Sequence, residues 1–182
     1  MLNNIVKWGK ELTEEELDII NTWRKKEFNS DHPWNKRYKN NFYDHVIFLL
    51  KERDTLLAFG RLRPVSLYQD TKVYEIWGIS TIIAIIRHKG YGKQIMNQIS
   101  KYIATHKKTA IGFCKKHNTP FYEKCGFRTI AGAKRNFIHV DESDTETPGK
   151  NDDFFYIKGD DELIEVLLKN PQTTFKHYIP HW

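Results

Sequence analysis

Cysteine is almost absent from this chain of 182 residues, which holds only Cys114 and Cys125. Two cysteines are too few for a disulfide framework, and they lack metal-ligand spacing. No apolar run approaches the roughly 18 residues that suggest a membrane span. Residues 1–10 have neither the apolar core nor the cleavage site of a signal peptide. These absences predict a cytoplasmic protein with no metal and no membrane partner.

Acidic residues are missing from a long central stretch. Between Ile76 and Tyr122 there is no Asp or Glu, although the chain contains 23 acids and has a net charge of +6. The same stretch carries eight basic residues: Arg87, Lys89, Lys93, Lys101, Lys107, Lys108, Lys115 and Lys116. This imbalance indicates an anionic partner. Nucleic acid, a phosphorylated cofactor, an anionic membrane surface and a plain solvated helix face all remain open on charge alone.

The composition itself favours one folded domain. Apolar residues make up 40% of the chain, and 11 Phe, 9 Tyr and 5 Trp can fill a core. A chain of this length buries most of its apolar surface in one domain. Because no repeat, linker or composition break appears, we expect a single domain over residues 1–182.

The first half predicts a strand, a helix and a β-meander. Asn4–Lys10 is a strand candidate, and Thr13 with Glu16 forms a capping box before apolar residues at helical spacing. Three β-rich segments follow after an aromatic loop: His45–Lys51, Thr55–Arg63 and Lys72–Ile83, the last two linked by Pro64–Thr71.

The second half alternates helices and strands. We expect a helix after Gly92, and a short helix that opens at Asn118-Thr119-Pro120 and ends at Gly126. The remaining expected segments are a strand at Thr109–Cys114, strands at Phe127–Val140 and Phe154–Lys158, a solvated acidic loop at Asp141–Asp153, a helix at Asp160–Lys169 and an aromatic tail at Pro171–Trp182.

One loop between a strand and a helix is built like an anion cradle. It reads Arg87-His88-Lys89-Gly90-Tyr91-Gly92-Lys93. A helix N-terminus offers unpaired backbone N–H groups and a partial positive charge. Glycines let a pyrophosphate approach that backbone, and the basic side chains add full charges. The alternative is a turn that merely starts a helix.

Two other phosphate motifs do not match this loop. The P-loop needs an earlier glycine and a Ser or Thr after its lysine, and both are missing around Lys93. The dinucleotide fingerprint needs glycine three positions after Gly92, where Ile95 stands.

A second segment, Asn118-Thr119-Pro120-Phe121-Tyr122-Glu123-Lys124-Cys125-Gly126-Phe127, follows the strand at Thr109–Cys114. Together with the upstream Arg-x-x-Gly-x-Gly, it resembles the GNAT superfamily of N-acetyltransferases. The resemblance is tight over Glu75–Phe127. It implies an α/β fold with a mixed, mostly antiparallel central sheet flanked by helices. The sheet would be splayed between its fourth and fifth strands, here Tyr74–Ile83 and Thr109–Cys114.

The resemblance also implies acetyl-CoA as the acyl donor and assigns residues to it. Backbone groups of Ile82 and Ile83 would bond the pantetheine amides, and the side chain of Asn118 would contact the cofactor arm. The alternative interpretation is that Asn118 is a plain helix N-cap. Backbone N–H groups from His88 to Lys93 would hold the pyrophosphate, with Arg87, Lys89 and Lys93 around it. Ala84 stands where the family often has proline.

Two residues are candidates for proton transfer. Tyr122 matches the family's frequent general acid, which protonates the departing thiolate; the alternative is a core aromatic. Glu75 stands on the strand where the family often keeps its base, and strand alternation would place it opposite Tyr74 and Ile76. Glu75 is otherwise an exposed strand residue or a lysine partner. His45 and Asp44 are alternative bases.

The acceptor amine is not identified by the sequence. In the family, the loop after the first helix lines the acceptor pocket, here Asn29–Asp44 with Asp31, His32, Trp34, Tyr38 and Tyr43; a hydrophobic flap over the core is the alternative. The predicted function is N-acetylation of a primary amine by direct attack in a ternary complex. The rivals are a catalytically inactive acyl-CoA sensor and a nucleic-acid-binding protein, for which no RNA-recognition signature is found. The tail with Phe175, Tyr178 and Trp182 leaves a homodimer open.

Overall fold

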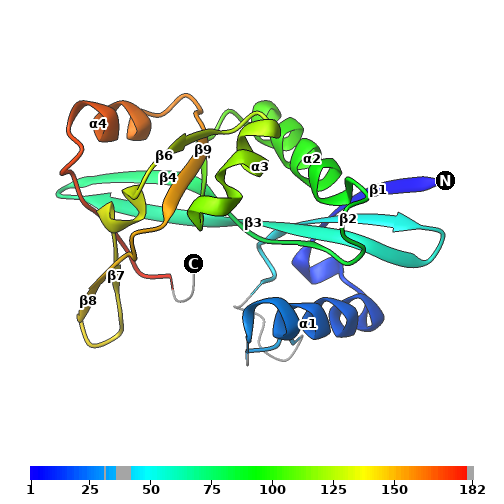
Figure 1. Ribbon diagram of the computed structural model, residues 1–182. Helices are drawn as coiled ribbons and strands as arrows, with labels where there is room; N and C mark the ends of the chain where they lie inside the picture. The colour runs from blue at the N-terminus through cyan, green and yellow to red at the C-terminus, as the bar shows by residue number, and fades with distance from the viewer. Residues whose placement is uncertain (31, 36–41, 180–182) are drawn as a thin grey trace. The chain divides into compact units, whose positions relative to one another are not determined.

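The computed structural model describes residues 1–30, 32–35 and 42–179. These residues form two units: unit 1 comprises Met1–Arg63 and Ile79–Lys101, and unit 2 comprises Pro64–Gly78 and Tyr102–Trp182. The long strands β3 (Thr55–Gln69) and β4 (Lys72–Ala84) and the helix α2 (Tyr91–His106) contribute residues to both (Figure 1). Asp31, Tyr38 and Trp182, named above for the acceptor pocket and the tail, lie outside the described residues.

Unit 1 begins with the predicted strand and capped helix. The strand β1 spans Leu2–Trp8, and α1 spans Glu14–Phe28. The capping box is confirmed: the Glu16 amide donates to Thr13 Oγ1 at 3.1 Å, and the Thr13 amide donates to Glu16 Oε2 at 2.9 Å. The strand β2 (Val46–Glu52) pairs antiparallel with β1 and with β3, so the first turn of the predicted meander is confirmed.

The two faces of the unit 1 sheet are packed by different elements. One face forms a core with α1 that includes Leu17, Ile20, Ile47, Phe59 and Ile83.

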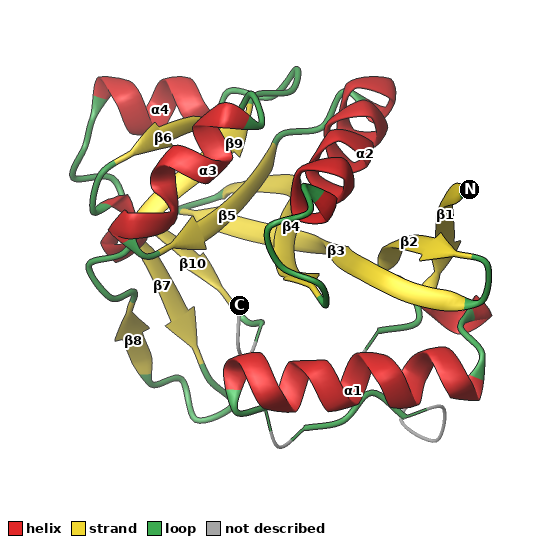
Figure 2. Cartoon of the chain, turned by 45° about the vertical axis from the view of Figure 1, so that its right-hand side comes forward, coloured by secondary structure: helices red, strands yellow, loops and turns green. Residues whose placement is uncertain are grey.

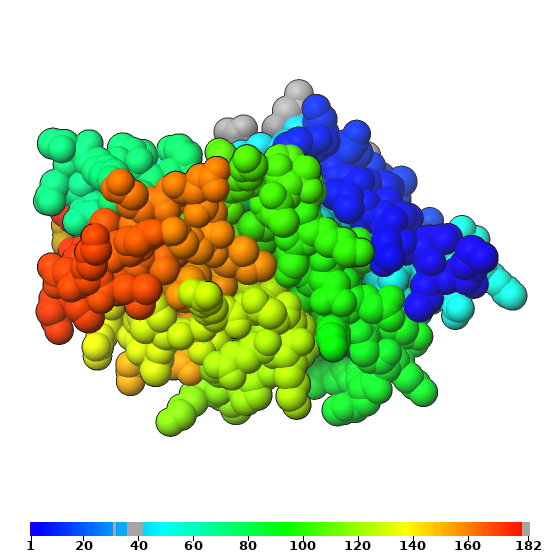
Figure 3. All heavy atoms as spheres, turned by 90° about the horizontal axis from the view of Figure 1, so that it is seen from above, coloured from blue at the N-terminus to red at the C-terminus, as the bar shows by residue number. Residues whose placement is uncertain are grey.

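The other face approaches α2 closely at Gly60. A Cβ on Gly60 would come within 2.6 Å of Ile95 and 3.2 Å of Ile99, so only glycine fits there. Figure 3 shows the N-terminal residues in blue beside green residues of α2, where Gln98 Nε2 donates to Asn4 Oδ1 at 2.7 Å.

Unit 2 contains the remaining strands and two short helices. Its strands are β5 (Ala110–Cys114), β6 (Arg128–Ile130), β7 (Phe137–Val140), β8 (Glu146–Pro148), β9 (Asp153–Ile157) and β10 (Phe175–His177). They join β3 and β4 in the order β6-β9-β5-β4-β3-β10-β7-β8. The pairs β4–β5 and β10–β7 are parallel, whereas β5–β9, β6–β9, β7–β8 and β10–β3 are antiparallel (Figure 2). The helices are α3 (Thr119–Lys124) and α4 (Leu163–Lys169).

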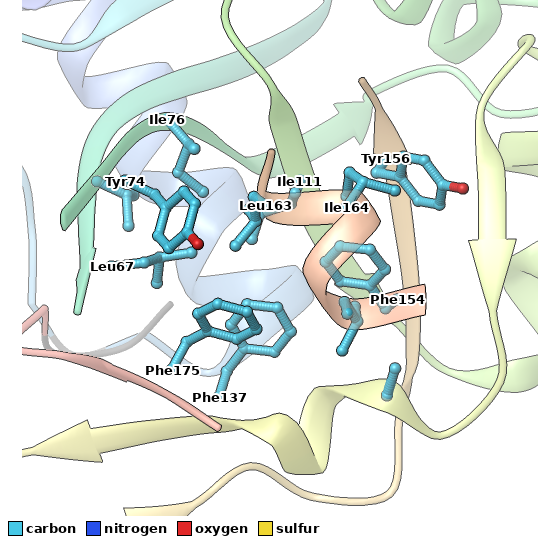
Figure 4. Close-up of a cluster of buried hydrophobic side chains, with 13 residues drawn as sticks. Leu67, Tyr74, Ile76, Ile111, Phe137, Phe154, Tyr156, Leu163, Ile164 and Phe175 are labelled. Atoms are coloured by element: carbon cyan, nitrogen blue, oxygen red, sulfur yellow. The ribbon is translucent and has the colours of Figure 1, made fainter. Parts of the chain in front are cut away.

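The core of unit 2 is rich in aromatic rings. Phe175 lies between Tyr74 and Phe137, with ring centroids 5.8 and 5.5 Å apart (Figure 4). Leu163 and Ile164 of α4 belong to the same cluster. Phe175 of the aromatic tail is therefore a core residue, while Tyr178 is exposed.

Three predicted boundaries are wrong. The strand β3 continues through Pro64 to Gln69 instead of ending at Arg63. On the edge of β3 that pairs with β2 and β10, Pro64 lies beyond Leu62, the last residue paired with β2, and before Tyr68, where β10 pairs. Proline is tolerated at such a locally unpaired edge.

The segment predicted as one strand over Phe127–Val140 is divided. Gly132 has a φ of 64° and starts a 3-10 helix at Ala133–Asn136, so β6 and β7 are separate strands. The loop predicted over Asp141–Asp153 contains β8, which pairs with β7, although its acidic side chains are largely exposed.

The predicted fold class is confirmed: the sheet is mixed, mostly antiparallel and flanked by helices. The fourth and fifth strands form a parallel ladder of two pairs, Trp77 with Ala110 and Gly78 with Ile111. The strand β4 then continues to Ala84 in unit 1. In the described part of the chain, no helix is both long enough and apolar enough to cross a membrane.

Candidate functional site

The glycine loop of unit 1 leads directly into α2. The first helical hydrogen bond runs from the Gln94 amide to the Gly90 carbonyl at 3.1 Å. The amides of Tyr91, Gly92 and Lys93 therefore precede the helical ladder, and an α-helix offers no internal acceptor to such groups. Gly90 has a φ of 75°, and a Cβ there would meet no atom of the described residues within 4 Å. Glycine is therefore required at this position by backbone conformation and not by crowding.

The side chains of this loop are open to solvent. Arg87, His88, Lys89 and Lys93 are exposed, whereas Tyr91 and Gly92 are half-buried. Arg87 Nη2 donates to both carboxylate oxygens of Glu27 at 2.8 and 2.6 Å. The positive charge of Arg87 is thus offset by α1, which leaves Lys89, Lys93 and the helix N-terminus as the stronger attraction for an anion.

The end of β4 carries a strained residue that sequence reasoning missed. Thr81 has a φ of 57°, which is a costly conformation for a β-branched side chain. Strain of this kind is concentrated at functional sites. No sequence signal marks it, because threonine is an ordinary strand residue and glycine would be expected at a positive φ.

Ile82 and Ile83 follow this strained residue and point in opposite directions. Ile82 packs towards Gly60 on the α2 side, and Ile83 belongs to the core on the α1 side. Since both side chains are used for packing, only backbone groups remain for a ligand at this point of β4. This agrees with the backbone role that the family resemblance implies.

In unit 2, Asn118 precedes α3, with Pro120 in the first turn of the helix as predicted. The side chain of Asn118 is exposed and makes no capping hydrogen bond. Asn118 therefore occupies the N-cap position, but its side-chain amide does not cap the helix and stays available to a ligand.

Tyr122 lies on α3 with its ring stacked on Phe155 at a centroid distance of 3.7 Å. Phe155 in turn packs on Gly112, where a Cβ would come within 2.3 Å of the ring. Burial raises the pKa of Tyr122 above its ordinary value, and the nearby thiols Cys114 and Cys125 act in the same direction. The phenol therefore keeps its proton at neutral pH and can act as a hydrogen-bond donor.

Glu75 lies on the exposed face of β4. Tyr74 and Ile76 are buried in the core of unit 2, so the predicted alternation is confirmed. Ser66 Oγ donates to Glu75 Oε1 at 2.7 Å. The carboxylate is accessible to solvent and has a neighbouring hydroxyl, which suits a base that acts directly or through water.

The alternative base His45 has a different environment. Its side chain is buried, with 4% exposed, and its Nε2 lies 3.6 Å from Asp44 Oδ1. Burial lowers the pKa of His45 to about 2, and the charges of Arg61, Arg63 and Arg24 add to the effect. His45 is therefore a neutral imidazole, while Asp44 is exposed.

The proposed acceptor loop is partly a core element. Trp34 is buried and stacks on Phe42 with a centroid distance of 5.5 Å, as the flap interpretation predicts. Asn21 fixes its backbone, because Asn21 Nδ2 donates to the Trp34 carbonyl and the Trp34 amide donates to Asn21 Oδ1, both at 2.8 Å. His32 is exposed and Tyr43 is half-buried.

A cluster of arginines near Trp34 was not anticipated. Arg24, Arg61 and Arg63 gather there on unit 1. The sequence does contain a signal, because Arg61 and Arg63 alternate with apolar residues in β3, whose residues from Leu56 to Leu62 are all buried. Two charges on the core face of a strand are unusual, and the alternation could have shown that they point inward.

The residues predicted for the site fall into two sets. Unit 1 holds the end of β4, the glycine loop and the alternative base His45, whereas unit 2 holds Glu75, Asn118 and Tyr122.

Comparisons with known proteins bear on the family and the fold of the chain. The family model described as the acetyltransferase (GNAT) family matches residues 10–127, which is more than half of the chain. The search of curated proteins gave no match.

Among solved structures, Escherichia coli ElaA is similar, with a TM-score of 0.58 and 17% identity over 87% of this chain and 99% of that one. Arabidopsis thaliana NAA60 in complex with acetyl-CoA has a TM-score of 0.52 and 14% identity, covering 85% of this chain and 97% of that one. A Bacillus subtilis acetyltransferase in complex with CoA has a TM-score of 0.51 and 18% identity, covering 86% and 99%. At these identities the likeness concerns the fold, and together with the family match it shows that the chain belongs to the GNAT family of acetyltransferases.

Proposed function

We propose that this protein transfers an acetyl group from acetyl-CoA to a primary amine by direct attack in a ternary complex. The observation that carries the proposal is the exposed glycine loop before α2, which lies in a stretch without acids and presents helix N-terminal amides. Solved structures of similar fold were determined with acetyl-CoA and with CoA, which supports the same donor here.

The donor is held largely by backbone groups in this proposal. The pyrophosphate binds the amides from His88 to Lys93, with Lys89 and Lys93 as flanking charges and Arg87 held by Glu27. The pantetheine amides bond the backbone of Ile82 and Ile83, whose side chains are occupied by packing. The free side chain of Asn118 contacts the cofactor arm.

The chemical step needs two proton transfers. The acceptor arrives as an ammonium ion and must lose a proton before its lone pair attacks the thioester carbonyl carbon. A C–N bond then forms and the C–S bond breaks. Glu75 takes the proton from nitrogen, directly or through water, and Tyr122 donates a proton to the departing thiolate. His45 is the alternative base, but burial and the neighbouring arginines lower its pKa to about 2, which makes its imidazole a weak proton acceptor.

The extent of the domain and the oligomeric state stay predictions. The family match begins at residue 10 and ends at residue 127, so it includes residues of both units. This supports one N-acetyltransferase domain over residues 1–182. A homodimer through the tail has less support, because Phe175 is buried in the core.

A panel of amines tests the proposal through release of the CoA thiol. We expect release that depends on both acetyl-CoA and an amine, with acetylated amine as the product. Binding of acetyl-CoA without turnover on any amine would favour the inactive sensor. An absence of acetyl-CoA binding by folded protein would contradict both.

A further inference from the structure

Two guanidinium groups of unit 1 converge on one buried indole. Arg24 Cζ lies 4.5 Å and Arg61 Cζ lies 5.1 Å from the centroid of the Trp34 ring. Arg61 is itself buried, with 7% exposed, and Trp34 is 4% exposed. Arg63 follows on the same face of β3 and is half-buried. Cation–π contact stabilises such an arrangement, but it does not remove the repulsion between like charges.

The hydrogen-bond partners of the two inner arginines are neutral. Arg61 Nε donates to Ser80 Oγ at 2.8 Å. Arg24 donates to the His32 carbonyl at 3.0 Å, to Ser30 Oγ at 3.2 Å and to Asn21 Oδ1 at 3.3 Å. Within the described ranges, neither guanidinium contacts a carboxylate.

The electrostatic effect of this arrangement is visible in the pKa values of the cluster. Burial lowers the pKa of Arg61 well below its ordinary value, and the charges of Arg63 and Arg24 lower it further. Burial lowers the pKa of Arg63 to about 10, and the charge of Asp44 offsets part of this shift. The Asp44 carboxylate is exposed and lies at the edge of the cluster, 3.6 Å from His45 Nε2.

Glu16, which is also in unit 1, shows how a buried charge is stabilised when its role is structural. Glu16 is 4% exposed, and its carboxylate accepts from Lys7 at 2.9 Å, from Lys51 at 2.8 Å and from the Thr13 amide at 2.9 Å. A buried ion is costly unless it is paired and hydrogen-bonded. Glu16 satisfies this rule. Among the described residues, Arg61 has a hydrogen bond to Ser80 but no carboxylate partner, which indicates that Arg61 is positioned for an anion from outside.

His45 supplies a second polar group at the same place. Its ring lies edge-on to Trp34 at a centroid distance of 6.4 Å. His45 Nδ1 is buried and has no hydrogen-bond partner in the described part of the chain. A neutral imidazole offers one N–H donor, which can complement a carboxylate without adding a further charge.

The position of this cluster on unit 1 connects it to the proposed donor site. Ser80, which binds Arg61, is followed directly by the strained Thr81 and then by Ile82, where the pantetheine arm is placed in the proposed function. A group bound by Arg61 would therefore lie beside the segment of β4 that meets the acyl donor.

We infer that the cluster of Arg24, Arg61, Arg63 and His45 binds the carboxylate of the acceptor, so that the substrate is an amine that also carries a carboxylate, as an amino acid does. This inference rests on the proposed function, because it names the substrate class for the same reaction. A guanidinium fork matches the two oxygens of a carboxylate, and a desolvated cation makes strong charge-assisted hydrogen bonds. The indole ring of Trp34 provides a planar surface for the guanidinium group.

Matched acceptors test the inference without any mutation. Several amino acids are compared with their carboxamides and with the decarboxylated amines, at fixed pH, by thiol release. We expect kcat/KM to be at least about tenfold higher for the carboxylated member, mainly through a lower KM. A carboxamide lowers the basicity of the neighbouring amine and raises its reactive fraction, so a preference for the amino acid over its carboxamide cannot arise from amine protonation. Equal kcat/KM across each set, with acetyl-CoA bound, would overturn the inference and leave the proposed function standing.

Two variants at Arg61 separate recognition from packing. Arg61→Met removes the charge and keeps a long unbranched side chain. Arg61→Lys keeps the charge but loses the planar guanidinium that can donate to both carboxylate oxygens. For Arg61→Met we expect KM for the carboxylated acceptor to rise about 10- to 100-fold, with an unchanged KM for the decarboxylated amine. Arg61→Lys should fall between Arg61→Met and the wild type. Arg128→Met, at an exposed arginine of β6, is the matched control and should behave like the wild type.

The affinity for acetyl-CoA is measured on the same variants. It should be unchanged in Arg61→Met, and the protein should be at least as stable as the wild type, because an inner cation is gone. An equal loss on both acceptors would make Arg61 a packing residue. A loss of acetyl-CoA affinity would assign the cluster to the phosphates of the donor. Either result would overturn the inference.

A binding measurement covers the case in which no amine is turned over. Thermal shifts of the wild type are compared for N-acetyl amino acids and their carboxamides. A thermal shift with the N-acetyl amino acid but not with its carboxamide supports the carboxylate site. An equal shift with both compounds, or no shift with either, contradicts it. Acetyl-CoA binding is titrated separately, so a failure of the proposed function is distinguishable from a failure of this inference.

Discussion

The two units of the molecule carry different kinds of chemistry. Unit 1 holds fixed positive charge: the exposed basic side chains between Arg87 and Lys93, and the guanidinium groups of half-buried Arg24 and buried Arg61 at Trp34. Unit 2 holds the groups suited to proton transfer, the carboxylate of Glu75 and the protonated phenol of Tyr122. In the proposed enzyme, unit 1 therefore supplies most of the binding groups, and unit 2 supplies Glu75 and Tyr122 for proton transfer together with Asn118 for the cofactor arm.

The contrast within unit 1 is equally informative. The glycine loop uses backbone amides and solvated lysines, an arrangement that suits a phosphate and is sensitive to salt. The arginine cluster uses guanidinium groups that are partly removed from solvent. Their hydrogen-bond geometry selects the shape of the anion, and salt screens their attraction for it less. Donor affinity should therefore weaken with ionic strength more steeply than the preference for a carboxylated acceptor.

The largest expected effect is on rate and tests the role given to unit 2. Tyr122→Phe keeps the ring on Phe155 and removes only the hydroxyl. We expect kcat to fall by about 10²–10⁴, as is common on loss of a positioned proton donor, with unchanged acetyl-CoA affinity. Steady-state kinetics and a binding titration measure the two quantities. A variant with wild-type kcat would make Tyr122 a packing residue.

The next effect is on affinity and tests the role given to unit 1. Gly92→Asp adds bulk and negative charge among the amides that precede the α2 ladder. Acetyl-CoA affinity should fall by about 100-fold or more, whereas Gly92→Ala should lose less because it adds no charge. Calorimetric titration gives both values. If the two variants bind equally well, the pyrophosphate lies elsewhere.

A smaller effect concerns the base. An alkylamine with a pKa near 10.4 is neutral in about one molecule per thousand at pH 7.4, so a base matters for it and hardly matters for an arylamine. Glu75→Gln should slow alkylamine acetylation about tenfold at neutral pH, with partial recovery as the pH rises. Ser66→Ala, which removes only the hydrogen-bond donor, should have a weaker effect. An equal loss for both amine types at every pH would transfer the role to His45 or to a water chain.

The last effect is on stability and not on activity, and it concerns Glu16, a buried carboxylate of unit 1 that is paired with Lys7 and Lys51. Burial alone would raise the pKa of Glu16, but hydrogen bonds from Lys51, the Thr13 amide and Lys7 outweigh it, and the net pKa is lowered. A lowered carboxylate pKa stabilises the fold above the unfolded value of 4.5, and this contribution is lost as the pH falls through the folded pKa.

Glu16→Gln should therefore lower the free energy of unfolding by about 1–3 kcal/mol at pH 7. The difference from wild type should shrink below pH 4.5, as followed by denaturant unfolding. Glu15→Gln, at an exposed neighbour, is the control. A constant difference between pH 7 and pH 3 would show that the charge of Glu16 does not matter.

Local signals were sufficient for much of the fold. The helix α1 was predictable because its capping box and apolar period lie within a few residues of one another. The loop before α2 was predictable for the same reason, since glycines and missing acids are visible in the sequence. The boundaries of β3 and of β6 and β7 were not, because they depend on which strand lies opposite Pro64 and on the left-handed turn at Gly132.

The unpredicted parts of the site are non-local. The positive φ of Thr81 depends on the course of β4 through the sheet, and threonine gives no hint of it. The arginine cluster brings together Arg24 of α1 and Arg61 of β3, which are far apart in sequence. Trp34 was named for the pocket of an amine acceptor, but its neighbours are cations, and this follows only from the contacts.

A calorimetric titration of the folded wild-type protein with acetyl-CoA is the decisive test of the proposed donor site. We predict saturable binding of one acetyl-CoA per chain, weakened by salt and lost in Gly92→Asp. The bound donor should also raise the melting temperature in proportion to the logarithm of its excess over Kd. Neither heat of binding nor a thermal shift at millimolar acetyl-CoA, with the protein fully folded, would contradict the proposed site.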